Sequence, residues 1–133
     1  MSRKIEDLTP AMQEKARAFA AEMASAGVPF IFTCTRRSLE EQRELYARGR
    51  TKPGPRVTWT LKSRHIDGEA FDIVICKAGV PQWDVKVDVD EDGIPDYTEA
   101  GQIGESVGLV WGGRFRNSKG KPQPDFPHFE LAT

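Results

Sequence analysis

The chain contains little of several residue types, and each shortage excludes a class of protein. It has two cysteines among 133 residues, Cys34 and Cys76, which lie in separate apolar stretches without Cys-x-x-Cys spacing. We therefore expect two buried thiols rather than a disulfide framework or a cysteine-ligated metal. A disulfide between them would require adjacent strands and an oxidising compartment.

Long apolar runs and an excess of one charge are also missing. No apolar stretch approaches the ~20 residues that span a bilayer, and the segment from Met1 to Asp7 is too polar for a secretory signal. We expect no segment that inserts into a membrane. We also expect synthesis in the cytoplasm without an export signal. The formal net charge is -1, so we expect no nucleic-acid partner, and the mild basic cluster between Arg36 and Arg56 is interpreted as a solvated face.

The remaining composition is that of an ordinary globular protein, with 38% hydrophobic and 29% charged residues. Its length predicts one domain over residues 1–133. Caps, turn residues and periodicity predict helices, strands and loops in mixed order. The expected helices follow Thr9-Pro10 up to Gly27, Ser38 up to about Arg48, and Thr98 up to Gly108. The expected strands are 28–35, 71–76, 83–87, 109–111 and 127–131, and the longer loops are 51–62 and 84–96.

Histidine occurs only twice, at His65 and His128, and each lies near a carboxylate. An isolated histidine is usually a partly buried ring with satisfied hydrogen bonds. On a helix, His65 and Asp72 would lie about two turns, roughly 10 Å, apart. Gly68 and the β-branched residues that follow Asp72 favour a turn and a strand instead, which can bring both side chains together. In that strand Asp72 would face one way, and Phe71 and Ile73 the other. An aspartate on an apolar strand is costly to bury unless it is paired or bound to a cation, so Asp72 is a candidate metal ligand.

The second histidine follows a carboxylate closely. Pro127 keeps the backbone between Asp125 and His128 out of a helix. A bend there can place Asp125 near a metal without ligating it, which is where a general base must lie. The alternative is an aspartate that caps a turn. Two imidazoles with two carboxylates are close to what a hydrolytic zinc site requires, and we interpret the chain as a small zinc hydrolase.

Separate sequence blocks, in order, resemble the VanY/CwlK-like M15 metallopeptidases. More narrowly, they look like the L-alanyl-D-glutamate peptidases of bacteriophage endolysins and of bacterial wall-remodelling enzymes. The blocks are Thr35 to Gln42, Leu45 to Thr58, Ser63-x-His65-x-x-Gly68-x-Ala70-x-Asp72, Gly108 to Gly113, and Asp125-x-x-His128-x-Glu130.

This resemblance implies an α+β fold, with a small antiparallel sheet flanked by about three helices, and a monomer that acts on the peptidoglycan stem peptide after its release to the cell wall. The zinc ligands would be His65, Asp72 and His128, with Asp125 as the general base. Arg37 would stabilise the oxyanion or hold the substrate, since the family pattern places an arginine directly before Ser or Thr, and Arg36 would be a solvent-facing charge. Ser63 would contact the substrate or support the ligands.

Two other functions remain open. A D,D- or L,D-carboxypeptidase of the same family would use the same ligands and differ in the loops around 51–62 and 77–97. A non-catalytic zinc-binding wall module is the other alternative, although such a module needs neither the Asp125 base nor the Arg37 cation.

A second metal motif lies between Asp88 and Glu99. Its acidic residues and Gly93 match an EF-hand calcium loop, with the Ile94 carbonyl as a further ligand. The candidate side-chain ligands are Asp88, Asp90, Asp92, Asp96 and Glu99. Pro95 departs from the pattern, and no helix is expected before the loop. We expect Ca²⁺ to order this loop and to position the wall of the active site; the alternative is a solvated acidic loop.

Overall fold

The chain combines helices with an antiparallel sheet, as expected of an α+β protein. The computed structural model describes residues 1–132 and, within them, contains three α-helices and a five-stranded sheet. The helices are α1 (Pro10–Ala26), α2 (Leu39–Ala47) and α3 (Asp96–Ser106). The strands are β1 (Phe30–Cys34), β2 (Ala70–Lys77), β3 (Val80–Gln82), β4 (Leu109–Trp111) and β5 (His128–Leu131), and short 3-10 turns cover Ile5–Asp7 and Gly112–Arg114.

Local sequence signals explain the ends of the first two helices. Thr9 caps α1 by accepting a hydrogen bond from the Met12 amide, and Gly27 ends the helix in the left-handed region at φ 72°. Ser38 and Glu41 form the expected capping box at the start of α2. Leu39, at the first position of α2, is 45% exposed, whereas Gln42 of the same helix is buried.

Two sequence-based boundaries are wrong. Helix α3 begins at Asp96 rather than after Thr98, because the Asp96 amide already bonds the Val87 carbonyl and an acidic side chain suits a helix start. Residues 83–87 form turns rather than a strand. The chain reverses earlier, at Ala78 and Gly79, whose positive φ values of 51° and 78° make a tight hairpin between β2 and β3.

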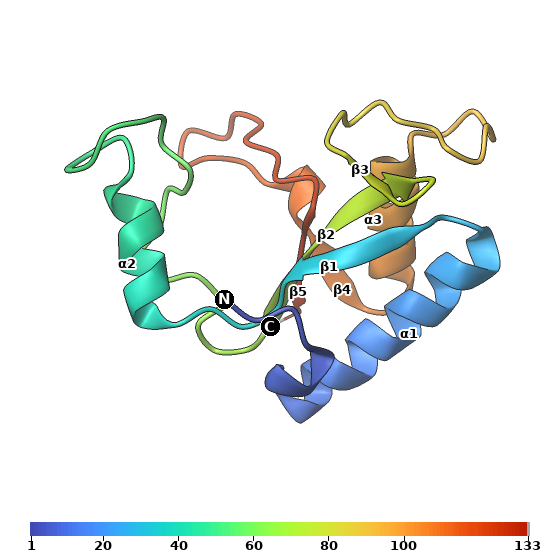
Figure 1. Cartoon of the computed structure of the whole chain (residues 1–133), viewed down its shortest axis with the longest axis horizontal. Helices are drawn as coiled ribbons and strands as arrows, with labels where there is room; N and C mark the ends of the chain where they lie inside the picture. The colour runs from blue at the N-terminus through green and yellow to red at the C-terminus, as the bar shows by residue number, and fades with distance from the viewer. Residues whose placement is uncertain (133) are drawn as a thin grey trace.

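The sheet is antiparallel throughout, and β2 lies at its centre. The strand order is β1-β2-β5-β4. Strand β3 pairs with residues 75–77 of β2, beyond residues 70–72, which pair with β5. Helices α1 and α3 lie against one face of this sheet, whereas α2 stands apart from them (Figure 1). The side chains of β2 therefore divide between a face covered by α1 and α3 and a face directed away from them.

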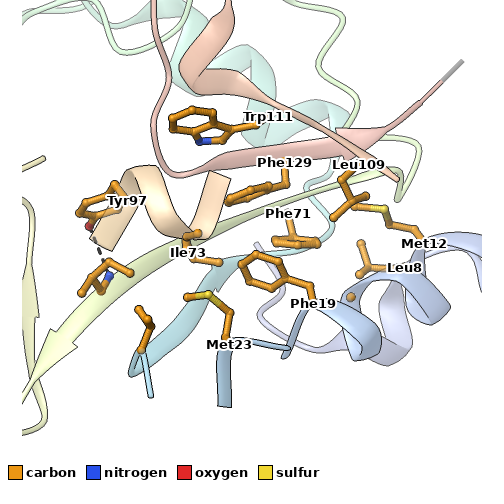
Figure 2. Packing of buried hydrophobic residues seen from close by; sticks show 14 residues of the cluster. Leu8, Met12, Phe19, Met23, Phe71, Ile73, Tyr97, Leu109, Trp111 and Phe129 are labelled. Atoms are coloured by element: carbon orange, nitrogen blue, oxygen red, sulfur yellow. Dashed lines mark hydrogen bonds between the residues drawn. The ribbon is translucent and has the colours of Figure 1, made fainter. Parts of the chain in front are cut away.

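The main hydrophobic core lies under α1 and α3 (Figure 2). Its centre is a cluster of rings in which Phe19 of α1 lies 5.2 Å from Phe71 of β2 and 4.9 Å from Phe129 of β5, between ring centroids. Phe71 and Ile73 point into this core, so Asp72 between them points to the opposite face, as the alternation predicted. Likewise Phe129 faces the core, and His128 shares the face of Asp72.

Close packing of α3 on β4 provides a stability prediction. A methyl group at Gly101 would overlap the ring of Trp111, which cannot move freely because its Nε1 donates to the Phe126 carbonyl. Alanine gains about 1 kcal/mol of helix propensity over glycine, but overpacking costs about 1–3 kcal/mol. We expect Gly101→Ala to lower the free energy of unfolding in urea, while Gln102→Ala, on the exposed side of α3, leaves it nearly unchanged. A Gly101→Ala protein as stable as wild type would contradict this packing.

Candidate active site

A cavity of about 690 Å³ opens on the sheet face directed away from α1 and α3. Its floor comes from β2 and β5 and its walls from α2 and from the loops at 57–65 and 115–125. The predicted residues Arg37, Ser63, His65, Asp72, Asp125 and His128 all line it. The structure therefore brings together side chains from distant parts of the chain, but no residue of 77–97 is among those that line the cavity. The acidic loop therefore does not line the cavity, and an effect of calcium on the active-site wall stays a prediction.

His65 is held by the backbone of the segment that follows β1. Its Nδ1 lies 2.8 Å from the Thr35 carbonyl and 3.5 Å from the Cys34 thiol. A β-bulge between Phe32 and Cys34 brings this segment under the ring. A hydrogen bond from Nδ1–H to the carbonyl leaves a lone pair on Nε2. This Nε2 is fully buried and makes no hydrogen bond to any described residue.

Asp72 and His128 face each other across neighbouring strands, because they are register partners on β2 and β5. Asp72 Oδ1 lies 3.0 Å from His128 Nδ1 and 3.2 Å from His65 Nε2. One atom from each of the three side chains lies within 4.8 Å of the other two. A buried set of two imidazole nitrogens and one carboxylate, with an unpaired nitrogen among them, fits Zn²⁺.

The ionisation of these groups follows from their close packing. Burial acts to lower the pKa of His65 and of His128, but close contact with the negatively charged Asp72 carboxylate outweighs it and raises these pKa values to about 10 and about 9. Burial would raise the pKa of Asp72, but its close contacts with the two histidines hold it well below its usual range. At neutral pH the metal-free site therefore carries protons that a metal ion must displace.

This proton load predicts how metal binding depends on pH. Because both imidazole pKa values are raised, we expect the apparent affinity for zinc to increase as the pH rises from about 6 toward the His128 pKa of about 9. Competition with a chelator of known affinity, corrected for the protonation of the chelator, measures this at each pH. An affinity that does not change over this range would contradict the proposed ligands.

Arg37 is buried beside the cluster, whereas Arg36 is exposed, which agrees with the assignment of the site role to Arg37. Arg37 Nη2 lies 3.9 Å from Asp72 Oδ2, and Arg37 Nη1 donates to Gln42 Oε1 at 2.6 Å. Gln42 in turn donates to the Thr60 carbonyl at 2.6 Å. Gln42 thus ties Arg37 to the 57–65 wall, a role that sequence reasoning missed.

Asp125 and Ser63 lie near the three clustered side chains without joining them. Asp125 lines the cavity, and its backbone amide donates to the Gly112 carbonyl at 2.8 Å. Desolvation and the negative charge of Asp72 raise the pKa of Asp125, which suits a group that must accept and release a proton. Ser63 Oγ accepts the His65 amide at 3.2 Å and so shapes the turn that carries this histidine.

Both cysteines are buried free thiols, as the sequence predicted. Sequence analysis did not foresee that Cys34 lies under His65, or that Glu130 contacts His128. The contact between Glu130 and His128 could have been predicted, because residues two apart on a strand lie on the same face of the sheet. Among residues 1–132, no helix has the length and apolar character to cross a membrane.

Comparisons with known proteins agree with this geometry. An M15 peptidase family model described as D-alanyl-D-alanine carboxypeptidase matches residues 56–131. Peptidoglycan L-alanyl-D-glutamate endopeptidase CwlK of Bacillus subtilis (strain 168) is 36% identical over 128 residues, covering 94% of this chain and 74% of that protein.

Solved structures resemble the fold. The L-Ala D-Glu endopeptidase ChiX of Serratia marcescens matches with a TM-score of 0.69 and 25% identity, over 96% of this chain and 83% of that one. The LD-carboxypeptidase LdcB matches with a TM-score of 0.65, over 98% of this chain and 63% of that one, and its 16% identity supports the fold alone. A family model that matches more than half of the chain, together with a relative 36% identical along 94% of it, establishes that this protein belongs to the M15 peptidases.

Proposed function

We propose that this peptidase is a zinc-dependent endopeptidase that cleaves the L-alanyl-D-glutamate bond of the peptidoglycan stem peptide. The observation that carries the proposal is the cluster of His65, Asp72 and His128 at the floor of a cavity that Asp125 and Arg37 also line. The 36% identity to an endopeptidase of this specificity favours this bond. Action at the cell wall after release, as in a phage endolysin, is part of the same proposal.

Each residue of the cavity has a distinct task. The side chains of His65, Asp72 and His128 would hold Zn²⁺, which when bound lowers the pKa of water and polarises a carbonyl group. Asp125 takes a proton from the attacking water and passes it to the leaving amine. Arg37, fixed by Gln42, offsets the negative charge that develops on the carbonyl oxygen. Ser63 supports the His65 turn and lies where a substrate can contact it.

Digestion of purified muropeptides followed by mass spectrometry tests the bond. An endopeptidase of this type frees a peptide that begins with D-glutamate and leaves L-alanine on the muramic acid. Products shortened only by a terminal D-alanine would favour the carboxypeptidase alternative, to which the description of the matching family model points. No cleavage by zinc-loaded protein would reject both.

We also propose a calcium site in the acidic loop. Oxygen atoms of Asp88, Asp90 and Asp96 lie within 4.8 Å of one another, as do those of Asp90, Asp92 and Glu99. The Asp88 carboxylate accepts the Gly93 amide at 2.9 Å, which keeps the loop curved inward.

Two carboxylates of this loop support a bound cation. Asp96 is 0% exposed, its Oδ2 accepts the Val89 amide at 2.6 Å, and its Oδ1 is buried without a hydrogen-bond partner among the described residues. Burial and the charges of Asp90 and Asp92 raise the pKa of Glu99 to about 7. A cation would satisfy the unpaired oxygen and relieve this repulsion. The Ile94 carbonyl would complete the site.

Calcium is therefore expected to raise the melting temperature of the wild-type protein. At a concentration near 100 times the Kd the stabilisation is about 2.7 kcal/mol. Asp96→Asn keeps an acceptor for the Val89 amide but removes the charge, so the calcium-dependent rise should largely disappear. Glu91 lies in the same loop but belongs to neither group of clustered carboxylates. Glu91→Gln therefore removes one charge and should retain the calcium-dependent rise in melting temperature. Melting curves that calcium leaves unchanged in wild type would reject the site.

A further inference from the structure

Glu130 contacts the side of His128 that faces away from Asp72. Its Oε1 lies 2.9 Å from His128 Nε2, while Asp72 Oδ1 lies 3.0 Å from His128 Nδ1. The two residues stand two apart on β5, so they share the cavity face while Phe129 between them is buried in the core. The imidazole is therefore held between two carboxylates, of which only Asp72 also reaches His65.

The Glu130 side chain is itself fixed. Its second oxygen, Oε2, lies 3.3 Å from Arg64 Nη1, and Arg64 Nη2 lies 3.5 Å from Glu69 Oε2. The backbone of Glu130 is paired on both sides, with Ala70 of β2 and Val110 of β4. Only 19% of the Glu130 side chain is exposed. A carboxylate held at both oxygens and along its backbone can set the orientation of a neighbouring ring.

We propose that Glu130 is a positioning residue for the metal site. It accepts the Nε2–H of His128, which places the lone pair of the neutral ring on Nδ1, the nitrogen that faces Asp72 and His65. A carboxylate behind a metal-binding histidine fixes its tautomer and raises its basicity. This inference depends on the proposed zinc site but not on which peptide bond is cleaved.

Glu69 offers a matched control. It is a glutamate that pairs with the same Arg64, but it does not contact His128. Glu69→Ala and Glu130→Ala therefore remove the same charge and the same arginine partner, and they differ in the contact with the imidazole. Glu130→Gln keeps the shape of the side chain and leaves an amide oxygen, a weaker acceptor for the Nε2–H of His128.

Zinc affinity, measured by chelator competition on proteins whose metal-free fold is checked by circular dichroism, gives a readout independent of activity. We expect Glu130→Ala to bind zinc about 10–100-fold more weakly than wild type. Glu130→Gln should lie between the two, and Glu69→Ala close to wild type. The visible spectrum of the Co²⁺-loaded protein should change in Glu130→Ala and remain as in wild type in Glu69→Ala.

Several results would overturn the inference. Equal zinc affinities in wild type and Glu130→Ala, or equal losses in Glu130→Ala and Glu69→Ala, would show that Glu130 acts only as a surface charge. If Glu130→Ala does not fold, Glu130→Gln decides, and an affinity equal to that of wild type rejects the role. A wild-type protein that binds no zinc would instead reject the proposed function itself, which keeps the two failures distinguishable.

Discussion

Asp125→Asn is expected to retain zinc and to lose about 10²–10⁴-fold in the rate of murein hydrolysis. The amide has nearly the shape of the carboxylate but cannot take a proton from water. Because Asp125 lies outside the cluster of His65, Asp72 and His128, its replacement leaves the candidate ligands in place. The rate of release of stem peptides from purified murein and the zinc content of the same sample are the two measurements.

A control substitution separates the role of Asp125 as general base from the effect of a change in net charge. Asp67→Asn removes one exposed carboxylate that does not line the cavity, and its activity should equal that of wild type. Murein hydrolysis by Asp125→Asn at a rate near wild type would show that Asp125 is not the base. Loss of zinc together with activity would show instead that Asp125 supports the metal.

The second large effect is expected from Asp72→Asn, through zinc binding itself. Asp72 is the side chain shared by His65, His128 and Arg37, at distances of 3.2, 3.0 and 3.9 Å. Its replacement removes a ligand and the negative charge that offsets Zn²⁺. The loss of affinity should exceed the roughly 10–100-fold typical of partners outside the ligand set, and peptidase activity should disappear with it.

Elemental analysis and melting curves with and without zinc test this expectation. Wild type should gain stability when zinc binds its folded state, and Asp72→Asn should gain almost none. Glu69→Gln, at the residue before β2, removes one charge and should behave as wild type. A variant that purifies with a full equivalent of zinc would remove Asp72 from the ligand set.

Features that depend on neighbours in sequence were predicted well. The Thr9 cap, the Ser38 capping box and the alternation of β2 involve residues within a few positions of each other, and the structure confirms them. The family pattern indicated which distant residues would meet, and the structure places His65, Asp72 and His128 in one cluster. Their role as zinc ligands stays a prediction.

Features that depend on contacts across the chain could not be predicted. The bulge that places Cys34 under His65 depends on the pairing of β1 with β2, which no local signal in β1 reveals. The link from Arg37 through Gln42 to the Thr60 carbonyl joins a helix to a loop. The acidic loop lies away from the cavity and follows a hairpin at Ala78 and Gly79 that pairs β3 with the end of β2. Each of these requires the tertiary fold.

Strand β2 has a consequence for engineering this protein. Phe71 and Ile73 fill the core on one side, and Asp72 between them reaches the cavity on the other. Any redesign of the core that shifts this backbone also shifts a carboxylate on which zinc binding depends, so gains in thermal tolerance obtained there would tend to reduce turnover. Residues 57–60 and Lys62 line the same cavity without contributing to the core cluster, which makes them the better place to alter substrate preference.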